Sequence, residues 1–389
     1  MRVIVTGLVA TYPVAGVAYD YLQYVQGFHA LGCDVVYLED TGQWFYDPVR
    51  ETFTPEPDTG ARFLAYALRE LLPARADAWA VRAPDGRWAG TDGAEVERLC
   101  ASADLFLNLS GACWLRDPYR RARRTAYVDT DPCYSQAKLA GAAAGTVTEE
   151  IAGQVALIRA HDVFFTLGEH VGAPDCAIPT CGIAWHPTRQ PIVLANWPVS
   201  PPCADGPFTT VMSWKIEPAA PVVGGSTYGG KDVEFERFLD LPSRTPVPLE
   251  VALSGRAPRE RLTAAGWRVV EARRVSSTLG AYRGYIERSR GEVSVAKNAY
   301  VATRSGWFST RSAAYLASAR PVVVQDTGFS SHLPSGPGLR PFTTMPAAVA
   351  ALEAVAADVT AAAEHARTVA EECFEAGAVL RRLLADAGF

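Results

Sequence analysis

The first forty residues alternate between two hydrophobic periodicities. An apolar run at about 2–9 is followed by a loop with Pro13 and Gly16, a stretch with helical spacing at 19–31, and the apolar run DVVYLED. The helical stretch ends at Gly32, a residue that commonly follows a helix. Continuous apolar runs are typical of strands buried between two layers of helices. The sequence therefore predicts a β-α-β unit and a parallel sheet.

The same alternation continues in two blocks, separated by a segment rich in Pro and Gly at 197–207. In the first block we expect strands at 104–111, 124–131 and 162–169 and helices at 63–72 and 147–160. In the second we expect strands at 209–214, 249–255, 267–272, 292–297 and 320–326, helices near 231–240, 258–265, 279–289 and 311–319, and a helical Ala-rich end. This order predicts an α/β fold with two Rossmann-like domains, 1–198 and 207–370, whose parallel sheets face a central cleft, and a C-terminal helix at 371–389.

Composition excludes several classes of protein. A chain of 389 residues with 49% hydrophobic and 20% charged residues is long and apolar enough for two folded domains. The net charge of -5 gives no support for binding nucleic acid, and no apolar run is long enough to span a membrane. The eight Cys residues form no C-x-x-C pair, so we expect no structural metal site. The apolar N-terminus fits a buried strand better than a signal peptide, which predicts reduced cysteines and a cytoplasmic protein.

Two segments of the second block could seat an anion. Ser309, Thr310 and Arg311 precede an apolar helix, where free backbone N–H groups and a guanidinium can receive phosphate oxygens. Gly230, before Lys231, would let the backbone approach a ligand beside an ammonium group. The alternative is that Ser309 only caps the helix and that Arg311 is solvated.

The second block resembles the donor-binding domain of GT-B glycosyltransferases. The resemblance lies in the segment SGWFSTRSAAYLASARPVVVQDTGFSSHLP and, more weakly, in TYGGKDVEFERFLDLP. It implies that 207–370 binds a nucleoside diphosphate sugar, that 1–198 binds the acceptor, and that 371–389 packs back on the first domain. It also implies two groups of donor-binding residues: Gly230, Lys231, Ser309, Arg311 and Ser312 at the diphosphate, and Asp326, Thr327 and Gly328 at the sugar. The pair of Glu residues found in the large retaining families is absent, with Ala314 at the second position.

An inverting transfer also needs a base at the acceptor hydroxyl, and the first block offers three candidates. Asp131, in VDTDP, follows a predicted strand, as Asp129 does; Glu169 ends another strand beside His170, and Asp20 lies in the first predicted helical turn. For each the alternative is structural: a turn former for Asp129 and Asp131, and a residue favoured at a helix start for Asp20.

We therefore expect a metal-independent enzyme with no cofactor that transfers a sugar from a nucleoside diphosphate sugar to a small molecule. The Ala- and Arg-rich composition favours a bacterial gene, and secondary metabolism is one setting for such a reaction. A nucleotide-sugar epimerase or hydrolase, or a non-catalytic two-lobed binding protein, are the alternatives. The loop after the first strand lacks G-x-G-x-x-G, which disfavours a dehydrogenase. The basic run at 116–125 fits a solvated helix face, and Trp185, Trp197 and Trp214 fit either an acceptor platform or the core.

Overall fold

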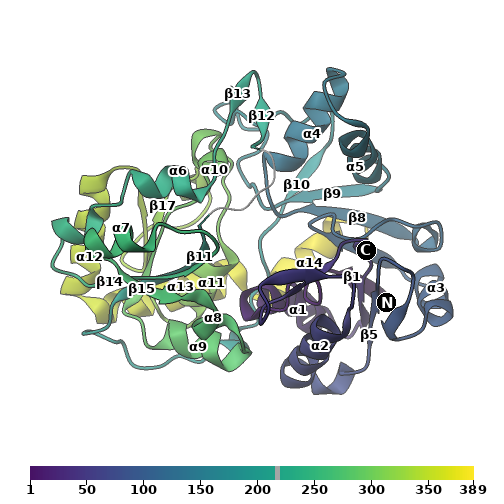
Figure 1. The fold of residues 1–389 in the computed structure, drawn as a ribbon, viewed down its shortest axis with the longest axis horizontal. Coiled ribbons are helices and arrows are strands. Elements are labelled where there is room, and N and C mark those ends of the chain that lie inside the picture. Colours follow the sequence, from purple (N-terminus) through teal and green to yellow (C-terminus); the bar gives the residue numbers. More distant parts are fainter. Residues whose placement is uncertain (215–219) are drawn as a thin grey trace.

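The computed structural model describes residues 1–214 and 220–389, which form two α/β lobes (Figure 1). The first lobe contains an eight-stranded sheet in the order β10-β9-β8-β7-β1-β2-β5-β6, and the second contains a six-stranded sheet in the order β15-β14-β11-β16-β17-β18. Within these sheets the described neighbours pair in parallel, except that β6 runs antiparallel to β5. The predicted fold class, two Rossmann-like domains with parallel sheets, is confirmed.

The elements of the first lobe are β1 (Arg2–Thr6), α1 (Ala15–Ala30), β2 (Asp34–Glu39), β3 (Phe45–Asp47), β4 (Thr52–Thr54), α2 (Asp58–Leu71), β5 (Trp79–Arg82), β6 (Trp88–Gly90), α3 (Gly93–Ala101), β7 (Leu105–Leu109), β8 (Arg124–Asp129), α4 (Tyr134–Ala143), α5 (Glu149–Arg159), β9 (Val163–Thr166) and β10 (Trp185–Pro187). The continuous burial of β1, β2 and β7 agrees with strands covered by helices on both faces.

The elements of the second lobe are β11 (Phe208–Ser213), β12 (Val222–Val223), β13 (Ser226–Thr227), α6 (Lys231–Glu236), β14 (Leu249–Ser254), α7 (Arg259–Ala264), β15 (Arg268–Glu271), α8 (Ala272–Ser276), α9 (Leu279–Glu287), β16 (Gly291–Ser294), α10 (Asn298–Ala302), α11 (Thr310–Ala317), β17 (Val322–Gln325), β18 (Leu339–Phe342) and α12 (Met345–Ala357). The chain then forms α13 (Val359–Phe374) and α14 (Ala376–Asp386).

Two predicted helices have different ends in the structure. Helix α1 begins at Ala15 rather than Tyr19, and its first turn lies next to the ring of Tyr282 in α9. Helix α6 ends at Glu236 rather than 240, and the turn that follows buries Phe238.

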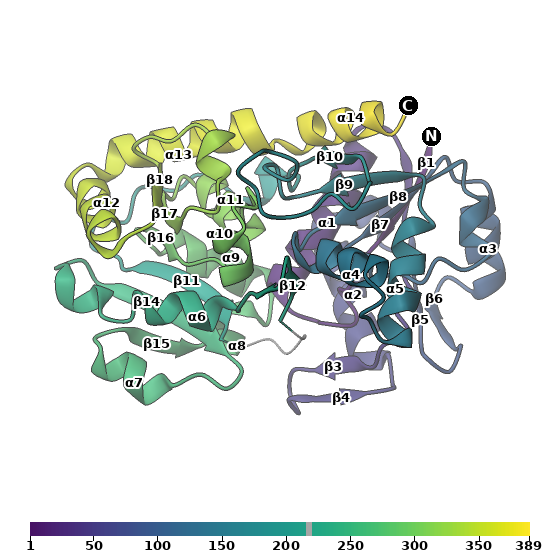
Figure 2. The same cartoon turned by 90° about the horizontal axis from the view of Figure 1, so that it is seen from above.

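The three C-terminal helices are separated by acidic caps. Asp358 accepts a hydrogen bond from the Ala361 N–H, and Glu375 accepts from Gly377 and Ala378, so each residue ends one helix and starts the next. Helices α12 and α13 meet at a bend of 105°, and within the described residues no single helix is long and apolar enough to cross a membrane. Figure 2 shows α13 and α14 running along both lobes.

Helix α14 packs against α1 of the first lobe. A Cβ atom on Gly27 would lie 2.4 Å from the Cδ1 atom of Leu380, so the glycine is what allows the close approach. Ile192 and Glu375 also form an isolated parallel bridge next to this contact. The chain therefore crosses between the lobes twice, once after β10 and once between α13 and α14.

The carboxyl edges of the two sheets face each other. Gly168, after β9, forms an antiparallel bridge with Trp307, and the His170 N–H donates to the Ser305 carbonyl at 3.1 Å. The Trp307 indole N–H donates to the Thr130 carbonyl, after β8, at 3.2 Å. We call the region between these loops the junction.

We expect Leu380→Ala to lower the free energy of unfolding by about 2 to 5 kcal/mol, because Leu380 is fully buried against α1 and its truncation leaves a cavity. Urea unfolding followed by tryptophan fluorescence measures the change. Arg382→Ala, an exposed change on the same helix, is the matched control. Equal unfolding midpoints for the two variants would show that α14 adds nothing to the stability of the first lobe.

Candidate functional site

A small pocket opens at the start of α11, between the carboxyl ends of β16 and β17. Its lining residues are Ser294, Val295, Ala296, Trp307, Phe308, Ser309, Arg311, Ser312, Val324, Gln325, Thr327 and Phe329. Four of the residues that the sequence places at the donor, Ser309, Arg311, Ser312 and Thr327, are among them. The Ser309 side chain makes no capping bond in the described structure, so its hydroxyl is available to a ligand.

The start of α6 is fixed to the ends of β16 and β17. The Gly229 N–H donates to the Asn298 side-chain oxygen at 2.9 Å, and the amide groups of Asn298 and Gln325 both donate to the buried Glu234 carboxylate, at 2.7 and 2.6 Å. Because this network is buried, it holds the Gly230 backbone and the Lys231 side chain in one position.

Lys231 is a cation in a positive environment. The pKa of its ammonium group is lowered to about 7, chiefly by burial and then by the nearby Arg311 and Lys297, while Glu292 and Asp131 act in the opposite direction. Across residues 1–214 and 220–389, no carboxylate lies within ion-pair distance of Lys231. An incoming anion would therefore be the partner that this ammonium group lacks.

Arg311 differs from the prediction of a solvent-facing phosphate ligand. Its Nε–H donates to Glu292 at 2.5 Å, and its terminal nitrogens donate to the Val211 carbonyl at 2.8 Å and to the Ser294 hydroxyl at 2.6 Å. The guanidinium is 11% exposed and Glu292 is fully buried. These internal bonds use three of the five guanidinium N–H groups, so Arg311 is anchored inside the second lobe and its positive charge lies at the wall of the pocket.

The loop after β17 is shaped by Asp326. Its carboxylate accepts from the Gly328 N–H at 2.9 Å and from the Ser330 hydroxyl at 2.7 Å, and Gly328 adopts a φ of 97°, which favours glycine. The Thr327 hydroxyl donates to the Trp307 carbonyl at 2.6 Å. Asp326 is thus a turn former in this structure, and its contact with a sugar stays a prediction.

Asp131 connects the lobes. Its carboxylate accepts hydrogen bonds from the Lys297 ammonium group and the Tyr300 hydroxyl of the second lobe, while its side chain stays half exposed. Burial raises the pKa of Asp131, but Lys297 and Tyr300 more than offset this effect, and the net shift is downward. Asp131 is therefore an ionised residue that positions Lys297.

The pKa of Asp20 is raised, whereas that of Asp131 is lowered. Asp20 lies on α1, and the pKa of its carboxyl group is raised to about 7, chiefly by burial. In this balance the Thr310 hydroxyl, Arg311 and Lys231 act to lower the pKa, and Asp131 acts with burial to raise it. These influences place Asp20 beside the start of α11 and among the charged residues of the junction.

Glu169 lies outside this group of charges. Arg189 donates to both of its oxygens, at 2.7 and 3.0 Å, and also to the His332 carbonyl at 3.1 Å. Asp129 is likewise committed elsewhere, since its buried carboxylate accepts from Ser135, Gln136 and Thr166. The structure brings Asp20, Asp131, Lys231 and Arg311 together. The carboxylates of Glu169 and Asp129 instead form hydrogen bonds that stabilise the fold.

Lys297, Tyr300 and Glu292 belong to the site but were missed by the sequence interpretation. Glu292 lies in β16, Lys297 follows that strand, and Tyr300 lies in α10. The rule that ligands bind beyond the carboxyl ends of parallel strands pointed to this position too. Nothing in the sequence, however, indicates that Glu292 would pair with Arg311 inside the sheet layer.

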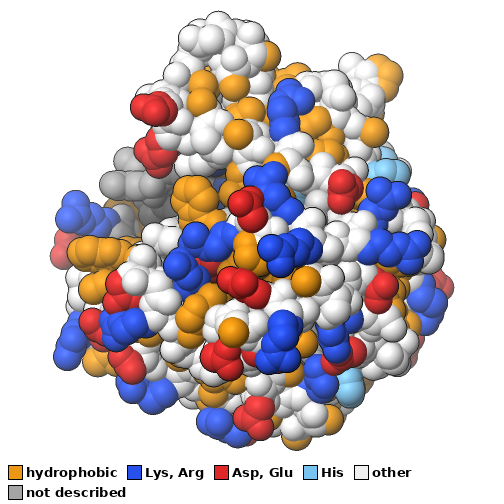
Figure 3. Space-filling view, turned by 90° about the vertical axis from the view of Figure 1, so that its right-hand side faces the viewer, with side chains coloured by type: hydrophobic (Ala, Val, Ile, Leu, Met, Phe, Trp, Pro, Cys, Tyr) orange, Lys and Arg blue, Asp and Glu red, His pale blue; other side chains and the backbone are white. Residues whose placement is uncertain are grey.

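The other sequence features have structural roles. Arg116, from the basic run, pairs with the buried Asp40 at 2.5 Å, and Figure 3 shows charges of both signs mixed over this side of the first lobe. Trp197 and Trp214 are buried. In the loop after β1, the Glu39 carboxylate accepts from the Ala10 N–H at 2.9 Å, so an internal anion fills the place where a dinucleotide phosphate would bind.

We expect Arg311→Met to lower the free energy of unfolding by about 3 to 5 kcal/mol, because it leaves the Glu292 carboxylate buried and unpaired. The double variant Arg311→Met/Glu292→Leu should recover most of this loss in urea unfolding. Arg244→Met, at an exposed site, is the control. A single variant as stable as the control would show that the buried pair contributes little.

No protein-family model and no curated protein sequence matches the chain. Among solved structures, it is similar to AviGT4, a glycosyltransferase involved in avilamycin A biosynthesis, with a TM-score of 0.54 and 13% identity over 100% of this chain and 97% of the other. The Anabaena protein Alr3699/HepE, solved with UDP-glucose, gives a TM-score of 0.59 and 11% identity over 99% and 98%.

Sucrose-phosphate synthase from Thermosynechococcus elongatus gives a TM-score of 0.54 and 13% identity over 99% of both chains. These similarities extend over both lobes and the C-terminal helices, but the identities are too low to indicate more than architecture. Together with the two parallel sheets, they show that this chain has the GT-B fold.

Proposed function

We propose that the protein is a glycosyltransferase that transfers a sugar from a nucleoside diphosphate sugar to a small-molecule acceptor. The observation that carries the proposal is the group of charged residues at the junction: Lys231, Lys297 and Arg311 from the second lobe beside Asp20 and Asp131 from the first. Cations beside a potential base are what the departure of a diphosphate and the deprotonation of a hydroxyl require.

On the donor side, the pocket at α11 would receive the diphosphate. Lys231 supplies an ammonium group without a described carboxylate partner, and the Ser309 hydroxyl and the N–H groups at the helix start supply hydrogen bonds. Because side chains balance the charge of the leaving group in this arrangement, the proposed reaction calls for no metal ion and no cofactor.

On the acceptor side, Asp20 is a better base than Asp131 or Glu169. A base works best with a pKa near the operating pH, and the Asp20 pKa of about 7 meets this condition. Asp131 is held ionised by Lys297, and Glu169 is bound on both oxygens by Arg189. This assignment applies to an inverting transfer.

The setting that we propose is bacterial secondary metabolism in the cytoplasm. It is supported by the composition and by the fold similarity to AviGT4, which is described as acting in avilamycin A biosynthesis. Incubation of the protein with the donor alone separates the proposed function from a hydrolase or epimerase, because a transferase needs the acceptor for turnover.

We expect a nucleoside diphosphate to bind wild-type protein and to bind Lys231→Gln about ten- to a hundredfold more weakly. This difference in affinity corresponds to the loss of one charge-assisted hydrogen bond. A titration series with UDP, dTDP and GDP measures this. Because a bound anion raises the Lys231 pKa from about 7, binding should also weaken as the pH rises above 7.

Arg244→Gln, which removes an exposed positive charge of the same lobe, is the control for this titration and should bind like wild type. Equal affinity of Lys231→Gln and wild type would remove Lys231 from the donor site. Failure of all three nucleotides to bind wild type would contradict the proposed function itself.

We expect kcat/KM to fall about tenfold per pH unit below 7, as Asp20 becomes protonated, and Asp20→Asn to lower it by about 10² to 10⁴. Transfer from the donor that binds best, assayed from pH 5 to 9, tests this. Asp77→Asn, at an exposed site of the first lobe, should keep the wild-type profile. An unchanged profile in Asp20→Asn would exclude Asp20 as the base.

A further inference from the structure

Four of the exposed large apolar side chains of the described residues lie on the first lobe, in segments that follow β2 and β7. Trp44, Val49 and Phe53 come from the segment after β2, and Trp114 comes from the loop after β7; they are 55%, 66%, 48% and 52% exposed. Exposed apolar residues gathered at one edge commonly mark a binding surface.

These side chains belong to one connected surface. A Cβ atom on Gly42 would lie 2.4 Å from the Trp114 indole nitrogen, so the loops after β2 and β7 touch. The Tyr46 N–H donates to the Thr11 carbonyl at 2.8 Å, which joins the hairpin β3–β4 to the loop after β1. On that hairpin, the ring of Phe53 packs against Tyr12 and Tyr46, with centroids 6.1 and 5.4 Å apart.

We call this surface, made of Tyr12, Trp44, Tyr46, Phe53 and Trp114, the aromatic surface. Tyr12 lies in the loop that leads from β1 into α1, the helix that carries Asp20, so the aromatic surface and Asp20 are joined by one continuous segment of the first lobe.

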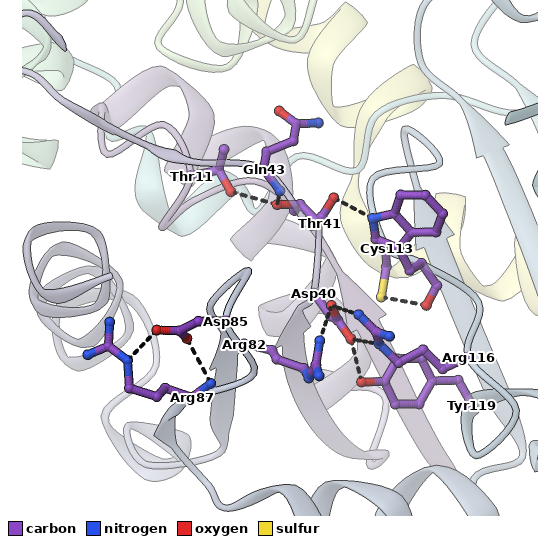
Figure 4. Close-up of polar contacts among 11 residues, drawn as sticks. Thr11, Asp40, Thr41, Gln43, Arg82, Asp85, Arg87, Cys113, Arg116 and Tyr119 are labelled. Atoms are coloured by element: carbon purple, nitrogen blue, oxygen red, sulfur yellow. Dashed lines mark hydrogen bonds and ion pairs between the residues drawn. The ribbon is translucent and has the colours of Figure 1, made fainter. Parts of the chain in front are cut away.

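The polar groups beneath the aromatic surface are already hydrogen-bonded. The Trp114 indole N–H donates to the Thr41 carbonyl at 2.7 Å, and the Thr41 hydroxyl accepts from the Gln43 N–H at 3.1 Å (Figure 4). Asp40 accepts from the Tyr119 hydroxyl at 2.8 Å and pairs with Arg116. A ligand at this surface therefore meets apolar ring faces and few free polar partners.

This property distinguishes between classes of acceptor. If the acceptor molecule is a sugar, its hydroxyl groups need several hydrogen-bonding side chains that converge on it. A planar apolar acceptor molecule instead gains binding energy by stacking on fixed aromatic rings. We infer that the aromatic surface binds the planar, apolar body of the acceptor and presents its hydroxyl to Asp20. The inference rests on the proposed function, and it replaces the buried Trp197 and Trp214 as platform candidates by the exposed Trp44 and Trp114.

The test measures binding of 4-methylumbelliferone, a planar aromatic alcohol, and of maltose by equilibrium titration in the presence of UDP. We expect 4-methylumbelliferone to bind wild type, and to bind Trp44→Ala and Phe53→Ala about five- to tenfold more weakly. Both side chains are exposed, so the variants should fold, which circular dichroism checks. Phe389→Ala, an exposed aromatic residue at the C-terminus, is the matched control and should bind like wild type.

Several results would overturn the inference. Equal binding of 4-methylumbelliferone by all four proteins, no binding to wild type, or tighter binding of maltose would each do so. Attachment of the protein to phosphatidylglycerol vesicles through Trp44 would also overturn it, since the surface would then bind a membrane. The affinity for UDP distinguishes failure of this inference from failure of the proposed function. If UDP binds and 4-methylumbelliferone does not, only this inference is wrong. If UDP does not bind, the proposed function is wrong.

Discussion

The contact of Asp131 with Lys297 and Tyr300 sets the geometry on which the site depends. It joins the carboxyl edges of two separate sheets, one acid from the loop after β8 and two donors from the segment after β16. Neither edge alone holds the full set of charged residues. The fold sets the two carboxyl edges opposite each other, and this contact, together with the backbone contacts of Trp307 and His170, holds charged residues of both edges against one another.

The same contact separates the roles of the acids at the junction. Asp131 has a cation and a hydroxyl to stabilise its charge, whereas Asp20 has mainly burial and weaker influences from Thr310 and Arg311. Two carboxylates of one site therefore differ in pKa because their partners differ. Lys231 shows the corresponding effect among the cations, since Arg311 already has Glu292 and Lys231 has no described carboxylate. Asp20 and Lys231, the two members of this group without a described ion-pair partner, thus lie where we put the ligands.

Sequence patterns predicted the fold well and the site in part. The β16 and β17 strands, and helix α11 before β17, follow from apolar periodicity and small residues, and so does the position of Ser309 at a helix start. The internal bonds of Arg311 and Asp326 could not be predicted in this way. A guanidinium can turn inward or outward from the same helix position, and only the neighbouring Glu292, fixed by sheet packing, decides the direction.

The same limit explains why the sequence left both a platform and the core open for Trp197 and Trp214, which the structure buries. Exposure is a property of the surroundings of a residue: Trp197 is enclosed by Tyr19 at a ring distance of 4.4 Å, while Trp114 is 52% exposed and is fixed by a hydrogen bond from its indole N–H to the Thr41 carbonyl. A tryptophan tied down at its polar atom keeps a fixed ring with an open apolar face. It loses little conformational freedom when a flat ligand stacks on it, so such a residue favours binding more than a mobile exposed side chain does.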